Sequence, residues 1–131
     1  MDIIITAVVI VSLMLLLKYI AQKRSQKAMG KQIDVSIFDG EIKELLNSDK
    51  SILYFYTPSC GACKTQVPII DKLKDELGVV GKIDLSKNMM ATKEFGILGT
   101  PTTAIMKGNT VSQIFVGLKK YDFLKSTFEA V

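Results

Sequence analysis

The 131-residue sequence contains no histidine and no tryptophan, and it has only two cysteines. Without histidine, the two thiols must carry out any chemistry without the help of an imidazole group. A zinc site needs four ligands, so the cysteines would need a dimer or additional carboxylates to form one. We therefore expect no metal site.

A basic domain surface is also missing. Residues 1–31 carry five lysine or arginine residues against one acid, whereas residues 32–131 carry twelve lysines and twelve acids. The net charge of +4 therefore comes entirely from the first 31 residues. A domain with balanced charge lacks the electrostatic footprint of a polyanion-binding protein, so we expect no binding of nucleic acid.

One long apolar run is present, at the N-terminus. Residues 3–17 carry no charge, and a helix extended to residue 21 is long enough to cross a hydrocarbon core of about 30 Å. Lys18 can extend its ammonium group to the headgroups, and Tyr19 suits the interface. We predict a transmembrane anchor over residues 1–21, which contacts the lipid bilayer through residues 3–21.

Two other interpretations of this run are less consistent with the sequence. A cleaved signal peptide has a basic start and a small-residue cleavage site, whereas this chain begins with Met-Asp and no A-x-A pattern follows. A buried core helix would be apolar on one side only, whereas this segment is apolar all round. A retained single-pass anchor is therefore the preferred interpretation.

A polar, basic tether is predicted over residues 22–33, followed by a domain over residues 34–131. The lysines of the tether are solvated, and they can also be attracted to anionic lipid. Positive residues next to a span tend to stay on the cytoplasmic side. Because the basic cluster follows the span, we expect the domain to lie in the cytoplasm.

The domain is predicted to belong to the α/β class, with elements in the order α-β-α-β-α-β-β-α. The expected elements are a helix at 40–47 capped by Asp39, a strand at 51–57, a helix at 60–77, a strand at 79–85, a helix at 87–95, strands at 102–107 and 110–116, and a last helix that buries Tyr121, Leu124 and Phe128. Gly108-Asn109 predicts a two-residue hairpin. Helical crossovers imply parallel strands, and the hairpin adds an antiparallel one, so we expect a mixed sheet covered by helices on both faces.

Both cysteines fall in the motif Cys60-Gly61-Ala62-Cys63, where a helix is predicted to follow a strand. The i, i+3 spacing places both sulfurs on one face, within reach of a disulfide. Free N–H groups and the helix dipole at this point favour a thiolate, and can lower a cysteine pKa from about 8.5 to roughly 3.5–7.5. Gly61 and Ala62 are small and leave the first sulfur approachable, and Ser59 is the expected N-cap.

Thiol–disulfide exchange is the chemistry that this placement favours. Cys60 would be the nucleophile that attacks a partner's disulfide, and Cys63 would resolve the mixed disulfide. The redox-active Cys60–Cys63 pair would itself carry the two electrons, as a dithiol when reduced and a disulfide when oxidised, so no other cofactor is expected. A purely structural disulfide would stabilise little because its loop is so short. Two inert core cysteines would not explain the position at a helix start.

The domain resembles a thioredoxin over roughly residues 35–131. Residues 60–63 match the CGPC position of that family, with alanine replacing the proline, and Pro68 matches its helix-kinking proline. The stretch FGILGTPT (95–102) resembles the one that carries the family's cis-proline. The resemblance implies the thioredoxin fold and a cis Thr100–Pro101 bond beside the sulfurs.

Substrate contacts are also implied by the resemblance. In the family, the backbone before the cis-proline pairs with an extended substrate, which points to Thr100 and Pro101. Gly117 matches a family glycine near the active site. With Gly61 and Ala62, these residues complete the expected substrate-binding set.

The sequence departs from the family pattern at several positions. Tyr54 stands where the family usually has a buried aspartate that helps to move the proton of the second cysteine, although Lys82, the usual neighbour of that acid, is present. Ser59 replaces the usual tryptophan, and Tyr56 takes another aromatic position. The resemblance therefore implies slower turnover and an altered substrate surface.

A membrane-tethered thiol–disulfide oxidoreductase is thus the expected function. Its partners would be protein thiols and disulfides and an upstream reductase or oxidase. The alternative is a non-catalytic, thioredoxin-like adaptor that holds a partner at a membrane.

Overall fold

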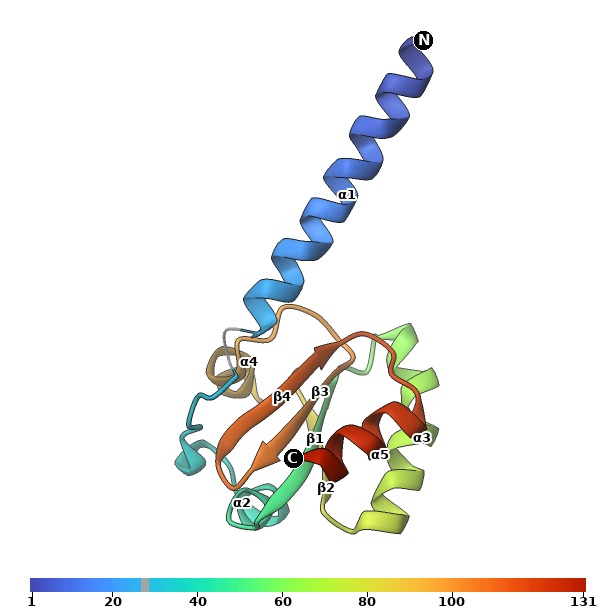
Figure 1. The fold of residues 1–131 in the computed structure, drawn as a ribbon. Helices are drawn as coiled ribbons and strands as arrows, with labels where there is room; N and C mark the ends of the chain where they lie inside the picture. The colour runs from blue at the N-terminus through green and yellow to red at the C-terminus, as the bar shows by residue number, and fades with distance from the viewer. Residues whose placement is uncertain (27–28) are drawn as a thin grey trace.

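The computed structural model describes residues 1–26 and 29–131 (Figure 1). The helices are α1 (Asp2–Gln26), α2 (Gly40–Leu46), α3 (Gly61–Leu77), α4 (Met89–Phe95) and α5 (Tyr121–Ala130). The strands are β1 (Lys50–Tyr56), β2 (Val80–Asp84), β3 (Thr102–Lys107) and β4 (Thr110–Val116). From α2 onward, the order of helices and strands is the predicted one.

The four strands form one mixed sheet in the order β2-β1-β3-β4. β2 is parallel to β1, whereas β3 is antiparallel to β1 and to β4. The prediction that a helical crossover makes β3 parallel to its neighbours is therefore wrong. A seven-residue α4 is only about 10 Å long and cannot return the chain along the sheet, so β3 starts beside the end of β1, where Thr102 pairs with Phe55.

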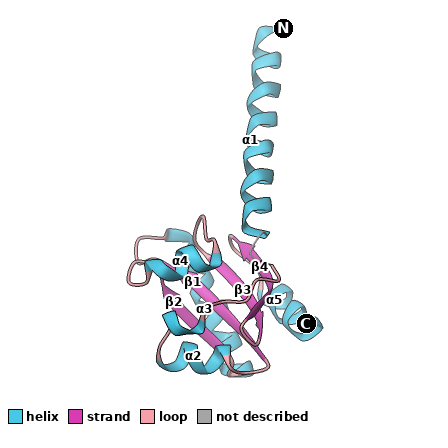
Figure 2. Ribbon diagram, turned by 90° about the vertical axis from the view of Figure 1, so that its left-hand side faces the viewer, coloured by secondary structure: helices cyan, strands magenta, loops and turns pink. Residues whose placement is uncertain are grey.

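Helices cover both faces of the sheet, as predicted (Figure 2). Successive residues of β1 alternate between the faces. Leu53 and Phe55 face the core formed with α2 and α4, whereas Ile52 and Tyr54 face the core formed with α3 and α5. Burying a large side chain of this kind contributes about 1.5–3 kcal/mol, so these two cores fix the position of β1.

The ends of the elements follow local side-chain chemistry. Asp39 occupies the N-cap position of α2, as predicted, but its side chain makes no capping hydrogen bond. α4 begins two residues later than predicted, because Asn88 caps it by accepting from the N–H of Ala91 at 3.1 Å. The predicted hairpin is confirmed, and Gly108 at its turn has a φ of +61°.

The apolar helix α1 projects from the domain (Figure 1). Its stretch Asp2–Lys23 is long and apolar enough to cross a membrane and is not buried against the domain. After α1, Gln32 forms a bridge to Thr110. Residues 27 and 28 of the predicted tether lie outside the described residues, and the boundaries of anchor, tether and domain remain predictions.

Candidate redox site

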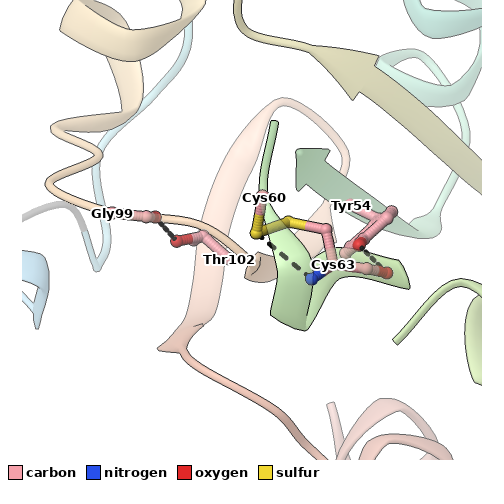
Figure 3. Close-up of a disulfide and its surroundings, with 5 residues drawn as sticks. All are labelled: Tyr54, Cys60, Cys63, Gly99 and Thr102. Atoms are coloured by element: carbon pink, nitrogen blue, oxygen red, sulfur yellow. Dashed lines mark hydrogen bonds between the residues drawn. A yellow bond between two sulfur atoms is a disulfide. The ribbon is translucent and has the colours of Figure 1, made fainter. Parts of the chain in front are cut away.

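Cys60 and Cys63 are joined by a disulfide, with their Cα atoms 5.3 Å apart (Figure 3). The pair lies where β1 passes into α3. The turn after β1 is closed by a hydrogen bond of 3.2 Å from the N–H of Cys60 to the carbonyl of Thr57. The helix begins at Gly61, one residue later than predicted, so the strand-to-helix placement of the motif is confirmed.

Cys60 itself is the N-cap of α3. Its Sγ atom accepts a hydrogen bond of 3.1 Å from the N–H of Cys63. The expectation that Ser59 caps this helix is therefore wrong, because the cysteine sulfur already occupies the capping position. When the disulfide is reduced, the same N–H group and the positive end of the helix dipole favour the thiolate form of Cys60.

The two sulfur-bearing residues differ in accessibility. Cys63 is 3% exposed, whereas Cys60 is half-buried. Gly61 and Ala62 are exposed, and nothing lies within 4 Å of the position that a Cβ would take at Gly61. An incoming disulfide therefore has access to Cys60 and not to Cys63.

Tyr54 lies beneath the second cysteine. Its side chain is fully buried on β1, and its hydroxyl group donates a hydrogen bond of 3.0 Å to the carbonyl oxygen of Cys63 (Figure 3). The ring stacks on Tyr56, with the centroids 5.8 Å apart. Burial, with a smaller contribution from Tyr56, raises the pKa of Tyr54 to about 12. This phenol therefore keeps its proton at neutral pH.

Lys82 pairs in register with Tyr54 across β1 and β2, but its ammonium group is engaged elsewhere. It forms a salt bridge with Asp71 on α3. The family resemblance implies a partner for Lys82 only at position 54, where this chain has a tyrosine instead of an acid. The acid supplied by α3 was not anticipated, because the packing of a helix on a strand cannot be read from separate segments.

The loop before β3 brings the other predicted residues together. The Thr100–Pro101 bond is cis, as the family resemblance implies. Thr102 Oγ1 donates to the carbonyl of Gly99 at 2.6 Å, and Figure 3 shows these two residues near the disulfide. Gly117, with a φ of +93°, donates its N–H to the carbonyl of Pro101 at 2.8 Å. Thr100, Pro101 and Gly117 therefore lie next to one another, with Pro101 buried and the other two partly exposed.

Gln66 is a structural residue of the site that the sequence interpretation missed. It is fully buried on α3, and its amide group makes two hydrogen bonds to the backbone of Lys119. Its Nε2 donates to the carbonyl at 3.0 Å, and its Oε1 accepts from the N–H at 2.8 Å. Its position three residues after Cys63 and four before Ile70, on the buried side of the helix, was the available signal.

Within the part of the chain that the structure describes, no group of three or more His, Cys, Asp or Glu side chains is placed to hold a metal ion. The reactive groups that the site offers are therefore the two sulfurs. The sequence profile of the family described as Thioredoxin matches residues 29–130.

The chain belongs to the thioredoxin family.

Individual thioredoxins are similar to it at the sequence level. Thioredoxin from Bacillus subtilis (strain 168) is 31% identical over 74 residues, which cover 54% of this chain and 71% of that protein. Thioredoxin from Rickettsia conorii is 34% identical over 86 residues, which cover 63% of this chain and 82% of that protein. These matches cover most of each relative, and α1 lies outside the region matched by the family.

Solved thioredoxin structures share the fold. A point-mutant thioredoxin from Halobacterium salinarum superimposes with a TM-score of 0.66 at 26% identity, over 71% of this chain and 84% of that one. Thioredoxin family membership, together with the Cys60–Cys63 pair, implies thiol–disulfide oxidoreductase activity. The roles of Cys60 as nucleophile and Cys63 as resolving residue remain predictions.

Proposed function

We propose that this thioredoxin-family protein is a membrane-tethered oxidoreductase that exchanges disulfides with protein partners. The observation that carries the proposal is the Cys60–Cys63 disulfide at the start of α3, with Cys60 accessible and Cys63 buried. A family name alone does not imply this order of attack. The difference in exposure supports it.

The reaction begins with the reduced pair. The Cys60 thiolate attacks one sulfur of a partner disulfide, forms a mixed disulfide and releases the other partner sulfur as a thiolate, which takes a proton from water. Cys63 then loses its proton to water, and its sulfur attacks Cys60. The second partner sulfur leaves, so the partner gains two electrons and the Cys60–Cys63 disulfide forms. An upstream reductase restores the dithiol, and an upstream oxidase would run the exchange in reverse.

Protein substrates bind across the cis-proline loop in this proposal. The backbone at Thr100 and Pro101 pairs with an extended segment of the partner, and Gly117 lies beside it. The small residues Gly61 and Ala62 leave the space over the Cys60 sulfur open. The electrons stay on the sulfurs throughout, so the reaction needs no additional cofactor.

The helix α1 supplies the membrane tether. Its stretch Asp2–Lys23 has a mean hydropathy of 2.6 and is unburied, which leaves a long apolar surface that a bilayer would cover. The basic residues lie at the C-terminal end of this stretch and just after it, which favours the cytoplasmic side for the domain. Tethering confines exchange to partners at the membrane and raises their effective concentration.

Insulin reduction by the full chain in detergent micelles, with dithiothreitol as the electron source, tests the activity. The wild type should accelerate insulin precipitation, and Cys60→Ser should not. Cys63→Ser should trap partners as mixed disulfides through Cys60, visible on non-reducing gels. If the wild type is as inactive as Cys60→Ser and its cysteines form no reversible disulfide, the non-catalytic adaptor function, which Tyr54 in place of an acid favours, replaces this proposal.

A further inference from the structure

α1 joins the domain at the end of the sheet where the dithiol lies, which is called the dithiol edge below. Figures 1 and 2 show the C-terminal end of α1 beside the loop that precedes β3 and beside the end of β4. α1 lies against β4 in the structure. Gly117, directly after β4, is bonded to Pro101 of the substrate loop. The hairpin at Gly108 lies at the opposite end of the domain (Figure 1).

A groove of about 550 Å³ lies between α1 and this edge. Its lining includes Lys18, Ala21 and Gln22 from α1 and Leu98, Phe115 and Lys119 from the domain. None of the described residues that line it carries a carboxylate. The groove therefore combines apolar walls with two ammonium groups.

Lys119 is held at the groove by aromatic rings. Its Nζ lies 5.9 Å from the ring centroid of Phe115 and 5.7 Å from that of Phe123. Among the described residues, neither Lys119 nor Lys18 forms a salt bridge. Both charges are thus available to an anionic group from outside the domain.

Some exposed apolar side chains lie at the same edge. Outside α1, and apart from Met29, the exposed large hydrophobic residues are Met89, Met90, Leu98, Val116, Leu118 and Phe123. They come from the start of α4, the loop before Pro101 and the segment from the end of β4 to the start of α5. Of these, Leu98 and Val116 line the groove, so its walls include exposed apolar side chains.

The position of the groove along α1 indicates which part of a bilayer lies next to it. The stretch Asp2–Lys23 has 22 residues. At 1.5 Å per residue that is about 33 Å, close to the thickness of a hydrocarbon core of about 30 Å. Lys18 and Gln22 lie in the last turns of this stretch, so they stand where lipid headgroups would be. The domain edge across the groove is then at the same level.

We propose that this edge binds the headgroup layer of an anionic bilayer, so that the dithiol works at the membrane surface. The proposal rests on the membrane tethering proposed above and adds an orientation to it. Phosphate groups pair with Lys18 and Lys119, beside the loop that binds the substrate. The substrates are then disulfides in segments of membrane proteins that lie next to the bilayer.

Fluorescence quenching in lipid vesicles tests the orientation. The full chain carries Cys60→Ser and Cys63→Ser, with a single new cysteine from either Ser59→Cys, beside the dithiol, or Lys107→Cys, at the far end of β3. Each is labelled with the fluorophore NBD and reconstituted into phosphatidylcholine–phosphatidylserine vesicles that contain a headgroup nitroxide lipid. The proposal predicts strong quenching at position 59 and little at position 107. Equal quenching at the two positions in vesicle-bound protein overturns it.

Charge reversal identifies the groove as the contact. Lys119→Glu should weaken the association of position 59 with the surface by about fivefold or more, because each basic residue at an anionic surface contributes attraction of that size. Lys43→Glu, on α2 at the far end, is the matched control and should leave the quenching unchanged. Equal effects of the two variants overturn the proposal. Vesicle-bound protein without quenching at position 59 also overturns it and would indicate that this edge faces a protein partner instead of lipid. Protein that fails to float with vesicles defeats the tethering itself, and the orientation with it.

Discussion

Tyr54 is the residue that contacts Cys63, the buried cysteine of the pair. A carboxylic acid at this position could exchange a proton with Cys63 near neutral pH, whereas the phenol of Tyr54, with a pKa of about 12, cannot. It instead donates a hydrogen bond to the Cys63 carbonyl. The residue therefore positions the first turn of α3, and the proton of Cys63 must pass to solvent.

Replacing Tyr54 with phenylalanine should destabilise the domain. The ring stays, but the hydrogen bond to the Cys63 carbonyl is lost. Because this carbonyl lies inside α3 and keeps its helical donor, the loss costs about 0.5–1.5 kcal/mol. Urea unfolding of the chain in detergent micelles measures this as a lower midpoint with an unchanged slope. Tyr56→Phe, which keeps the neighbouring ring, is the control. An unchanged midpoint for Tyr54→Phe would contradict the positioning role.

The pH dependence of stability gives a second test of Tyr54. Its pKa is about 12 in the folded protein against 10.0 for a free phenol, so the unfolded state loses the proton first. The contribution is therefore complete below pH 10 and falls by about 1.4 kcal/mol per pH unit as the pH rises from about 10 to about 12. The wild type should lose stability over this window more steeply than Tyr54→Phe, in unfolding curves at several pH values. Identical slopes would show that the phenol is not desolvated.

At the scale of elements, local signals identify most segments, and contacts between segments explain the errors. The hairpin at Gly108-Asn109 and the cysteine pair at the start of α3 are local features, so the sequence predicts them correctly. The prediction for the direction of β3 is wrong, because this direction depends on whether a short helix can span the sheet. The predicted capping residue of α3, Ser59, is wrong, because the sulfur of Cys60 accepts the capping hydrogen bond.

Gln66 connects two elements and is the clearest case of information that the sequence hides. A single glutamine in a helix is usually solvated, but this one holds the backbone of Lys119 against α3. Gln66→Ala should leave both backbone groups of Lys119 without their partner and loosen the segment that follows Gly117. Hydrogen exchange should become faster at residues 118–120, with Gln113→Ala on β4 as the control. Unchanged protection there would rule out this link.

At the scale of the whole molecule, the chain consists of the apolar helix α1 followed by a thioredoxin-family domain. The domain follows from the family match and the observed sheet, whereas the membrane role proposed for α1 rests on its length, composition and exposure. Sequence predicts such a helix well, because apolarity over a whole span is a local property. It could not predict the groove between α1 and the dithiol edge, since that depends on where the chain leaves the domain.

If α1 spans a membrane as proposed, a charge in the middle of the helix should disrupt its insertion. Leu13→Arg places a guanidinium near the centre of the span, where insertion becomes less favourable by about 2.5–3.5 kcal/mol. The variant should appear in the soluble fraction after carbonate extraction, whereas wild type stays with the membrane pellet. Gln22→Arg, near the end of the span, is the control and should behave as wild type. Retention of Leu13→Arg equal to that of the control would count against a spanning helix.

The most direct test of the chemistry is the pH dependence of Cys60 alkylation in the Cys63→Ser chain, which keeps the backbone N–H that faces the sulfur. If the helix start stabilises the thiolate, the rate of reaction with iodoacetamide should reach half its maximum well below the value of about 8.5 typical of a free thiol. The same chain unfolded in urea should return to that value. A folded protein with the same midpoint as the unfolded one would contradict the account.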